Sequence, residues 1–263
     1  MSTNPHEPLS FTRLLALNEQ RLDYPRSLVD FAYEQLLSML VTMKIEPGSH
    51  IGIEALAREL RISQTPIREA LTLLEAQKLA HKIPNVGFRA ASLLTHDDVN
   101  SLFEIRLLIE PAMAALAAKR ASKDMLKELT ALARDLELAA KGNELAYAQF
   151  AEGDAKLHHL VAAASGNRFI ADAIQGLHVH LHIFRFLYKT NSPEKAVMEH
   201  ALLLEALLAR DPSAAEHAMR EHLHASRQRL EIVMEPGDEA VATQPVPDQA
   251  PPAKKRGRRP KTS

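Results

Sequence analysis

The chain of 263 residues contains no cysteine and no tryptophan, and it has only 9 glycines. The lack of cysteine excludes disulfides, zinc–thiolate sites and a thiol nucleophile. Scarce glycine, together with abundant alanine and leucine, favours helices over sheets. The composition therefore predicts a mainly α-helical protein, and its 46% of hydrophobic residues are enough to build a core.

Long apolar runs are also absent from the sequence. No stretch approaches about 18 consecutive apolar residues, so we expect no membrane span. The N-terminal segment MSTNPHEPLSFTRLL lacks a basic region followed by an apolar run, so we expect no signal peptide. Together with the lack of cysteine, these features are compatible with a cytoplasmic protein, and we expect that location.

Charges of the two signs nearly cancel, giving a formal net charge of −1, but they are unevenly distributed. The C-terminal segment AKKRGRRPKT contains six lysines and arginines and no acid. The residues just before it are rich in proline and poor in large apolar side chains. We therefore expect residues 235–263 to be a disordered linker with a basic tail, and residues 1–24 to be an N-terminal extension.

Hydrophobic periodicity and turn residues divide the rest of the chain into two domains. Residues 25–92 contain three predicted helices followed by the turn PNVG between two short strands, which is the pattern of a winged helix-turn-helix. Residues 95–234 predict an antiparallel bundle of six to seven helices. The helices that we place in it span residues 96–120, 123–141, 144–164, 167–190, 193–209 and 212–234.

The helix that follows the break SQTP is the candidate recognition helix of the first domain. Gln64, Thr65 and Arg68 lie near its N-terminus, where the side chains of a recognition helix reach base edges and phosphates. Arginine can bond guanine through two donors, and glutamine can bond adenine. This helix is therefore the predicted reader of DNA sequence.

The turn PNVGF forms the predicted wing, which can lie along the minor groove. Asn85, Gly87 and Arg89 would then be close to the DNA backbone. A three-helix module can instead be a protein-interaction domain, and residues 25–91 have a near-neutral charge by our count. The pattern alone leaves both interpretations open.

Acidic and histidine side chains at helical spacing mark a candidate metal site in the bundle. Asp154 and His158 lie four residues apart and share a helix face, and His200 and His222 stand in two later predicted helices. If all three helices turn these groups inward, they meet in the bundle core, where facing helices commonly build metal sites. One carboxylate and three imidazoles suit Zn, Ni, Mn or Fe.

The alternative is that this spacing arises by chance, because the chain has 13 histidines. His178 and His182 form a rival pair near His180. A pair such as Asp154 and His158 is often only a surface hydrogen bond. Spacing alone does not separate a metal site from such contacts.

The first domain resembles a known family. The segment from EPGSH to GFRA, which contains TPIREAL, resembles the DNA-binding domain of GntR-type bacterial regulators. In that family the recognition helix and the wing contact DNA, which implies these roles for Thr65, Arg68, Asn85 and Gly87. Gln64 stands where most members have arginine, and we expect it to shift one base preference from G toward A.

The second half resembles the all-helical ligand-binding domain called FCD, found in the FadR branch of the same family. Its metal-bearing members carry D-x-x-x-H, then E-H, then H-L, and this sequence reads DAKLH, EH and EHLH in that order. The resemblance implies that Asp154, His158, His200 and His222 bind a divalent metal ion. It also implies a homodimer on a palindromic operator, and a small carboxylate-bearing metabolite held beside the ion.

Arginines in the bundle are the candidates to hold that effector. Arg106 is the first, because it lies among apolar positions of the first bundle helix and a guanidinium binds carboxylates well. Its alternative is an ion pair with Glu110, four residues on. Arg185 is the second, because it shares a helix face with His178 and His182, and this set could line the pocket from another helix.

The basic segment KKRGRRPK resembles an AT-hook, whose R-G-R-P core lies in the minor groove of A·T-rich DNA. Arg256 and Arg258 would make these contacts, although Arg259 interrupts the match. The alternative is a nonspecific polycation that adds salt-dependent affinity for DNA.

Together these features predict a metabolite-responsive transcriptional regulator, a repressor that a small organic acid releases from its operator. The rival interpretation is a metal-dependent enzyme with an accessory DNA-binding module. Its general base would be Glu199, which is adjacent to His200 and therefore diverges from it on a helix. A third interpretation is a nucleoid-binding protein that relies on the tail, and removing residues 245–263 would abolish its DNA affinity.

Overall fold

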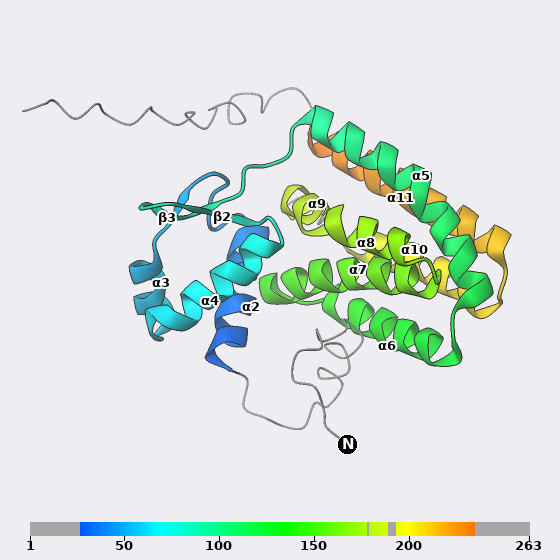
Figure 1. Ribbon diagram of the computed structural model, residues 1–263, viewed down its shortest axis with the longest axis horizontal. Helices are drawn as coiled ribbons and strands as arrows, with labels where there is room; N and C mark the ends of the chain where they lie inside the picture. Colours follow the sequence, from blue (N-terminus) through cyan, green and yellow to red (C-terminus); the bar gives the residue numbers. More distant parts are fainter. Residues whose placement is uncertain (1–26, 178, 189–192, 235–263) are drawn as a thin grey trace, which may run out of the picture.

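The computed structural model describes residues 27–177, 179–188 and 193–234, which form two helical domains (Figure 1). The mainly α fold class predicted from the sequence is confirmed. The predicted N-terminal extension and basic tail lie outside the described residues. The elements of the N-terminal domain are α2 (Leu28–Val41), β1 (His50–Ile51), α3 (Ile53–Leu60), α4 (Gln64–Ala76), β2 (Ala80–Ile83) and β3 (Gly87–Ala90).

Helices α2 and α4 form the core of the N-terminal domain. Leu36 and Leu40 on α2, and Leu71 and Leu74 on α4, are fully buried. Their spacing of three or four residues gives each helix one apolar face, and these two faces pack together. The opposite face of α4, which includes Gln64, Thr65 and Arg68, is exposed.

The three strands form an antiparallel sheet in the order β1-β3-β2. Ile83 pairs with Gly87, so residues 84–86 form the turn that the sequence predicted between two strands. Asn85 has a φ of 61° and Gly87 a φ of 118°, a region that glycine enters freely and asparagine tolerates better than most residues. Strand β1 was not predicted, because two residues are too few to show an alternating pattern.

The C-terminal domain is a helical bundle. Two of its helices lie on either side of residue 178, which is outside the described residues, and both fall within the stretch 167–190 that the sequence predicted as helix. The helices are α5 (His96–Arg120), α6 (Lys123–Ala139), α7 (Glu144–Ala164), α8 (Arg168–Leu177), α9 (Val179–Leu187), α10 (Glu194–Leu208) and α11 (Pro212–Val233).

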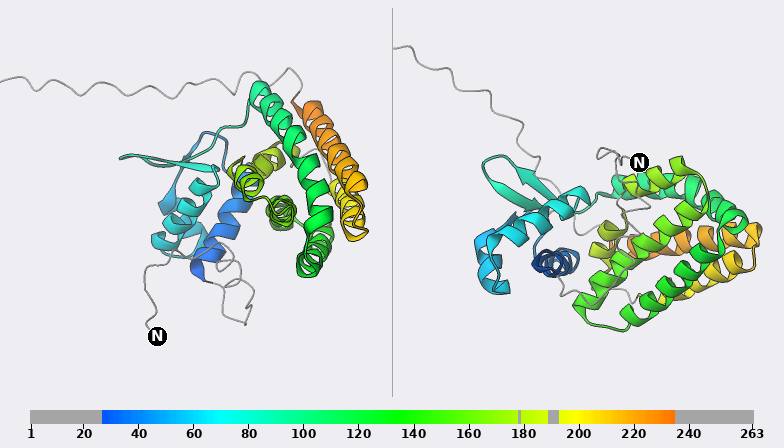
Figure 2. Two further views of the ribbon diagram at one scale, coloured as in Figure 1. Left: turned by 45° about the vertical axis from the view of Figure 1, so that its right-hand side comes forward. Right: turned by 60° about the horizontal axis from the view of Figure 1, so that its bottom comes forward.

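Helix α7 is the central helix of the bundle. It contacts α5, α6, α8 and α9 within its own domain and α2 of the N-terminal domain. Helices α5 and α11 lie side by side along one edge of the bundle, and α7 runs between α6 and α9 (Figures 1 and 2). The side chain of Asn143 caps α7 by accepting hydrogen bonds from the amides of Leu145 and Ala146. Side chains on most faces of α7 are consequently buried.

Polar side chains join the two domains at the first half of α7. The hydroxyl of Tyr33 on α2 donates to Glu152 Oε1 at 3.0 Å and accepts from Gln77 Nε2 at 2.8 Å. Lys44 Nζ lies 2.5 Å from Glu144 Oε2. Because these contacts involve α2 and α4, the position of the recognition helix depends on the position of α7.

A second connection runs from α9 to the linker that follows β3. Nη2 of Arg185 donates to the carbonyl oxygen of Ala91 at 2.7 Å, and Nη1 donates to that of Ser92 at 3.2 Å. Arg185 is fully buried there. The start of the interdomain linker is therefore held by a side chain of the bundle.

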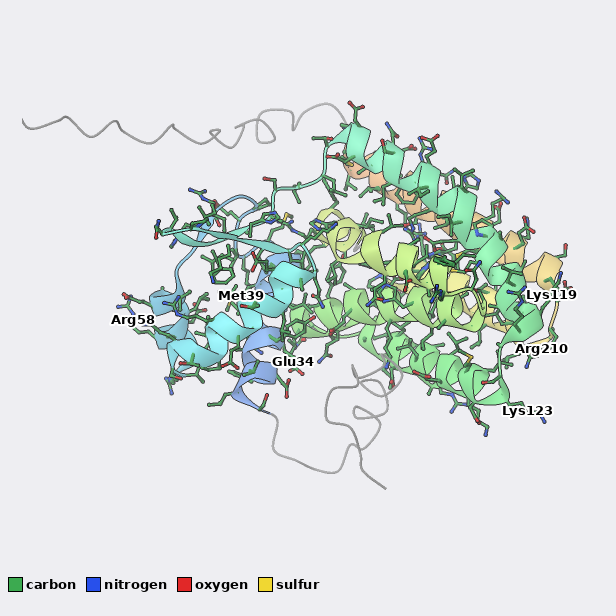
Figure 3. The ribbon with its side chains drawn as sticks, in the orientation of Figure 1. Glu34, Met39, Arg58, Lys119, Lys123 and Arg210 are labelled. Atoms are coloured by element: carbon green, nitrogen blue, oxygen red, sulfur yellow. The ribbon has the colours of Figure 1, made fainter. Side chains whose placement is uncertain are left out.

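Basic side chains lie at both ends of the molecule. Arg58 on α3 lies at one end, and Lys119, Lys123 and Arg210 lie at the other (Figure 3). All four are exposed. Among the described residues, no helix combines the length and the apolar character needed to cross a membrane.

Candidate metal centre and DNA-binding surface

The structure brings four sequence-predicted side chains together inside the bundle. Asp154 and His158 come from α7, His200 from α10 and His222 from α11. Each offers one ligand atom, these atoms all lie within 4.8 Å of one another, and all four residues are buried. The pair on α7 lies on successive turns of one buried face, and α10 and α11 supply the other two groups.

Two glutamates, the buried Glu110 and the half-buried Glu199, orient two of these imidazoles. Nδ1 of His158 lies 2.5 Å from Glu110 Oε2, and Nδ1 of His222 lies 2.8 Å from Glu199 Oε2. An ionised carboxylate can only accept, so Nδ1 carries the proton and Nε2 keeps its lone pair. Nε2 of His158 is buried without a hydrogen-bond partner. A carboxylate behind a histidine in this way is typical of metal ligands, because it fixes the tautomer and the ring orientation.

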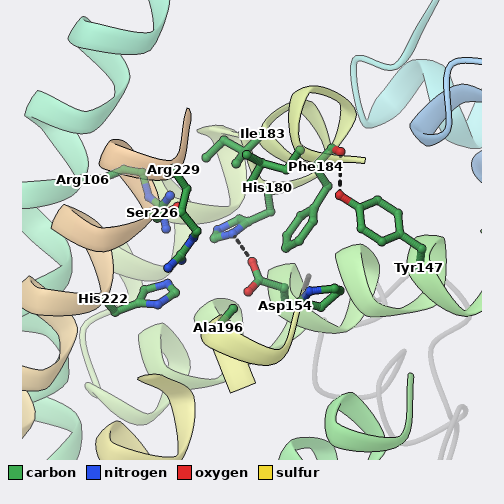
Figure 4. Close-up of a pocket in the computed structure, with 12 residues that line it drawn as sticks. Arg106, Tyr147, Asp154, His180, Ile183, Phe184, Ala196, His222, Ser226 and Arg229 are labelled. Carbon is green, nitrogen blue, oxygen red and sulfur yellow. Dashed lines mark hydrogen bonds and ion pairs between the residues drawn. The ribbon is translucent and has the colours of Figure 1, made fainter. Parts of the chain in front are cut away.

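Asp154 lies beside two histidines, His180 and His200. Its Oδ2 accepts a hydrogen bond from His180 Nδ1 at 2.8 Å (Figure 4). Its Oδ1 lies 3.2 Å from His200 Nε2, and neither ring nitrogen of His200 has a partner with hydrogen-bond geometry. His180, on α9, was not among the predicted site residues. Its only sequence signal is its place between His178 and His182.

Each of these two glutamates is in turn paired with an arginine. Nε of Arg106 lies 2.5 Å from Glu110 Oε1, so the ion pair that was the alternative role for Arg106 is present. Arg229 donates to both carboxylate oxygens of Glu199, with Nη2 at 2.9 Å from Oε2. Two chains of arginine, glutamate and histidine therefore converge on the cluster from α5 and from α11.

The geometry around Glu199 corrects one expectation. Glu199 was expected to point away from the site because it is adjacent to His200 on α10. Adjacent residues do diverge, but α11 packs against α10 and brings His222 to the Glu199 carboxylate. Burial would raise the pKa of Glu199, but His222 and Arg229 outweigh it and lower this pKa to about 2. Such a carboxylate is a weak base at neutral pH.

Burial and charge set the protonation of the other groups. Burial alone would raise the pKa of Glu110, but Arg106 and His158 hold it well below its usual value. Burial would also raise the pKa of Asp154, and its histidine contacts outweigh that effect. For His158, burial is the largest effect and lowers the pKa to about 4, against the raising effect of Glu110. The carboxylates are therefore ionised and His158 is neutral at pH 7.

A pocket opens beside the cluster (Figure 4). Its cavity volume is about 20 Å³, which is room for about one water molecule. Arg106, Asp154, His180, His222 and Arg229 line its polar side. Its other walls are Tyr147, Ile183, Phe184, Leu187, Pro193, Ala196 and Ser226.

The remaining predicted effector residues have other positions. Arg185 does not line this pocket, because its guanidinium is directed to the carbonyls of Ala91 and Ser92. His178 lies outside the described residues. Arg106 is the one predicted effector residue that the structure places at the pocket.

The donor set fits a divalent transition metal. Three imidazoles and one carboxylate are the ligand types that Zn, Ni, Mn and Fe accept. The unpartnered Nε2 of His158 and the two unpartnered ring nitrogens of His200 are buried polar atoms, and buried polar atoms without a partner are costly. A cation among these groups would supply the missing partner.

The predicted DNA-contacting residues of α4 lie on its exposed side. Gln64, Thr65 and Arg68 are exposed at the first turn, and Arg68 Nη2 donates to Gln64 Oε1 at 3.3 Å. Ser63 precedes the helix as its cap residue, but its side chain makes no capping hydrogen bond. The first-turn amides of α4 are therefore open to a phosphate.

The predicted wing residues extend the same surface. Asn85 is exposed in the turn, Gly87 is half-buried, and the exposed Arg89 donates to the carbonyl of Gly48 at 2.7 Å. Arg256 and Arg258 of the basic tail lie outside the described residues.

A winged helix-turn-helix attached to a helical domain with a buried polar cluster defines a DNA-binding transcriptional regulator. The family model "Bacterial regulatory proteins, gntR family" matches residues 28–89, and the model "FCD domain" matches residues 101–225. The chain belongs to the GntR family, in the branch that carries an FCD domain.

Individual relatives agree with this assignment. The chain is 28% identical over 227 residues to the "Uncharacterized HTH-type transcriptional regulator YdhC" of Bacillus subtilis (strain 168), covering 85% of this chain and 100% of that one. It is 23% identical over 199 residues to the "HTH-type transcriptional repressor GlaR" of Escherichia coli (strain K12), covering 73% and 90%. Among solved structures, E. coli McbR/YncC is similar with a TM-score of 0.58 and 24% identity, covering 79% and 98%. That structure supports the fold.

Proposed function

We propose that this regulator is a repressor whose helical domain binds a divalent metal ion and, beside it, a small carboxylate-bearing metabolite. The observation that carries the proposal is the buried cluster of Asp154, His158, His200 and His222, with ligand atoms within 4.8 Å of one another. The glutamate behind His158 and the one behind His222 orient these rings as ligands. The relative GlaR, named as a repressor, supports the sign of regulation.

The proposed roles follow from position. Asp154 and the three histidines would hold the ion, whose positive charge binds a carboxylate oxygen of the effector. Arg106 lines the adjacent pocket and supplies guanidinium donors. Gln64, Thr65 and Arg68 would contact base edges and phosphates, and the wing residues Asn85, Gly87 and Arg89 would contact the DNA backbone. A homodimer would place two recognition helices on a palindromic operator.

The proposed mechanism is thermodynamic linkage between the two sites. The pocket is lined by α7, α9 and α11, and α7 and α9 also contact the DNA-binding domain. If the effector binds better to one arrangement of these helices, and that arrangement misplaces α4, effector and DNA weaken each other's binding by the same factor. A tail that acts alone as a nucleoid binder has no part in this linkage, and removing residues 245–263 should leave operator recognition intact.

The test uses the full chain loaded with zinc and a DNA operator selected from a random library by the protein itself. A thermal-shift screen of carboxylic acids should identify stabilising compounds. Those compounds should weaken operator binding, measured by fluorescence anisotropy, and chelation of the metal should abolish their effect. If no carboxylic acid both stabilises the zinc-loaded protein and changes its operator affinity, the proposal is wrong.

A further inference from the structure

Two arginines face the pocket beside the metal cluster, and one of them, Arg229, takes the place that the sequence analysis gave to Arg185. Arg106 reaches it from α5 and Arg229 from α11 (Figure 4). Arg106 is 1% exposed, and the side chain of Arg229 is 13% exposed. Both are already paired with glutamates, Arg106 with the buried Glu110 and Arg229 with the half-buried Glu199. Their charges are therefore largely balanced before any effector arrives.

The charges around the pocket can be counted from these side chains. Arg106 and Arg229 are the two cations, and Glu110, Glu199 and Asp154 are the three anions. Histidines that coordinate a metal are neutral, because each must offer a lone pair. The protein groups thus carry a net charge of −1, and a bound divalent ion changes it to +1. One negative charge on the effector would bring the buried site to neutrality, whereas two would leave an uncompensated charge, which is costly in a buried site.

The residues that line the pocket agree with this count of charges. Away from the arginines and the cluster, its wall consists of Ile183, Phe184 and Leu187 on α9, with Pro193 and Ala196 opposite. Ser226 and Tyr147 carry the hydroxyl groups among the lining residues, and that of Tyr147 already donates to the carbonyl oxygen of Phe184 at 2.9 Å. None of the lining side chains in the described part of the chain offers a cation to a second carboxylate at this apolar end. Arg185, also on α9, is directed to the linker carbonyls instead.

We infer that the effector is a short monocarboxylate with one negative charge, whose uncharged tail lies against the apolar wall of α9. This inference rests on the proposed function and narrows it: dicarboxylates and tricarboxylates are selected against, and a tail hydroxyl can be met by Ser226. Arg229, which sequence reasoning did not single out, determines this charge preference together with Glu199.

The first test compares acids that differ only in their second carboxylate. Butanoate is compared with succinate, and lactate with malate, by calorimetric titration of the full zinc-loaded chain. We expect each monoanion to bind about tenfold tighter or better than its dianion partner, or about 1.4 kcal/mol. Equal or tighter binding of the dianions in both pairs would overturn the inference.

The second test changes the charge of the site. Glu199→Gln raises the net charge of the metal-loaded site to +2, and Arg229→Gln lowers it to zero. We expect the first variant to shift preference toward succinate by about tenfold, and the second to weaken both acids. The double variant restores +1 and should restore the preference for butanoate. A preference in the double variant unlike that of the natural chain would show that specific contacts, not net charge, set the selectivity.

Two further measurements keep these tests interpretable. Zinc content is measured for every variant. If a variant has lost zinc, its binding data are set aside, and the four acids titrated into the natural chain decide the inference. Operator release is measured with the same four acids. If dianions bind and release DNA, this inference fails while the proposed function stands; if none of a wide panel of acids binds or releases DNA, both fail.

Discussion

The two domains place their functional side chains in opposite ways. In the N-terminal domain the core is apolar, with Leu36, Leu71 and Leu74 fully buried, and the candidate DNA contacts are exposed on α4 and the wing. In the helical domain the four candidate ligands are buried together with Arg106 and Glu110, and Glu199 and Arg229 are half-buried beside them. Residues of the DNA-reading surface can therefore change without affecting folding. The polar groups of the metal site need partners inside the folded bundle, so changes there affect its stability.

The largest expected effect is on stability, and it comes from leaving one charge of the buried polar cluster without its partner. Glu110→Gln removes the charge that faces both Arg106 and His158, leaving a buried arginine uncompensated. We expect the metal-free protein to lose about 3–5 kcal/mol of unfolding free energy, measured by urea denaturation of the helical domain.

Glu104→Gln is the matched control for this variant, since Glu104 is exposed on the same helix, α5. It should change stability by no more than about 0.5 kcal/mol. A Glu110 variant as stable as the Glu104 variant would mean that the interior of the bundle tolerates charge changes as well as the surface does.

The next effect concerns the metal itself. His158→Ala removes the ligand whose Nε2 is buried without a partner. Because loss of even an outer partner of a ligand weakens metal binding by about 10–100-fold, we expect loss of the ligand to weaken it by more than about 100-fold. Elemental analysis after equilibration with zinc would measure this.

His224→Ala provides the comparison, because His224 lies on α11 close to His222 but is exposed. It should keep a full complement of metal. Undiminished zinc in the His158 variant would remove that residue from the ligand set and weaken the proposed site.

The sequence could predict some parts of the site because their signals are local. The spacing of Asp154 and His158 puts both on one face of a single helix, and the resemblance to FCD domains implied His200 and His222. Glu110, His180 and Arg229 were not predicted as site residues. Their roles depend on which helices pack together, and each contacts a partner at least 26 residues away in the chain.

The predicted fold shows the same division between local and long-range signals. Long helices such as α5 and α7 were placed to within a residue or two, because the polar cap residues Thr95 and Asn143 mark where they begin. Arg185 was assigned to the effector pocket, whereas its guanidinium contacts the linker carbonyls. That contact depends on how α9 packs against its neighbours, which periodicity along one helix does not report.

A smaller effect is expected at the DNA-reading surface. Arg68→Ala removes an exposed guanidinium at the start of α4, so we expect operator affinity to fall by about 1–3 kcal/mol. Metal content and stability should be unchanged, because Arg68 is not part of any core. Anisotropy titrations would measure the first quantity, and elemental analysis and urea denaturation the other two.

Arg134→Ala, at an exposed position on α6, is the corresponding change on the helical domain. It should leave operator affinity as it is. If both variants lost operator affinity to the same extent, the loss would reflect the overall charge of the protein rather than a contact between α4 and DNA.

The smallest effect on binding is expected where the two domains meet. It tests whether effector binding in one domain is coupled to DNA binding by the other. Arg185 joins α9, which lines the pocket, to the carbonyls of Ala91 and Ser92 in the linker. Arg185→Lys keeps the charge but removes the fork that reaches both carbonyls. We expect effector binding and operator binding, each measured alone, to stay within about twofold, while the factor by which they weaken each other falls by about three- to tenfold. An unchanged coupling factor would show that the signal does not pass through this linker contact, and would leave the α2–α7 contact through Tyr33 and Glu152 as the route between the pocket and the recognition helix.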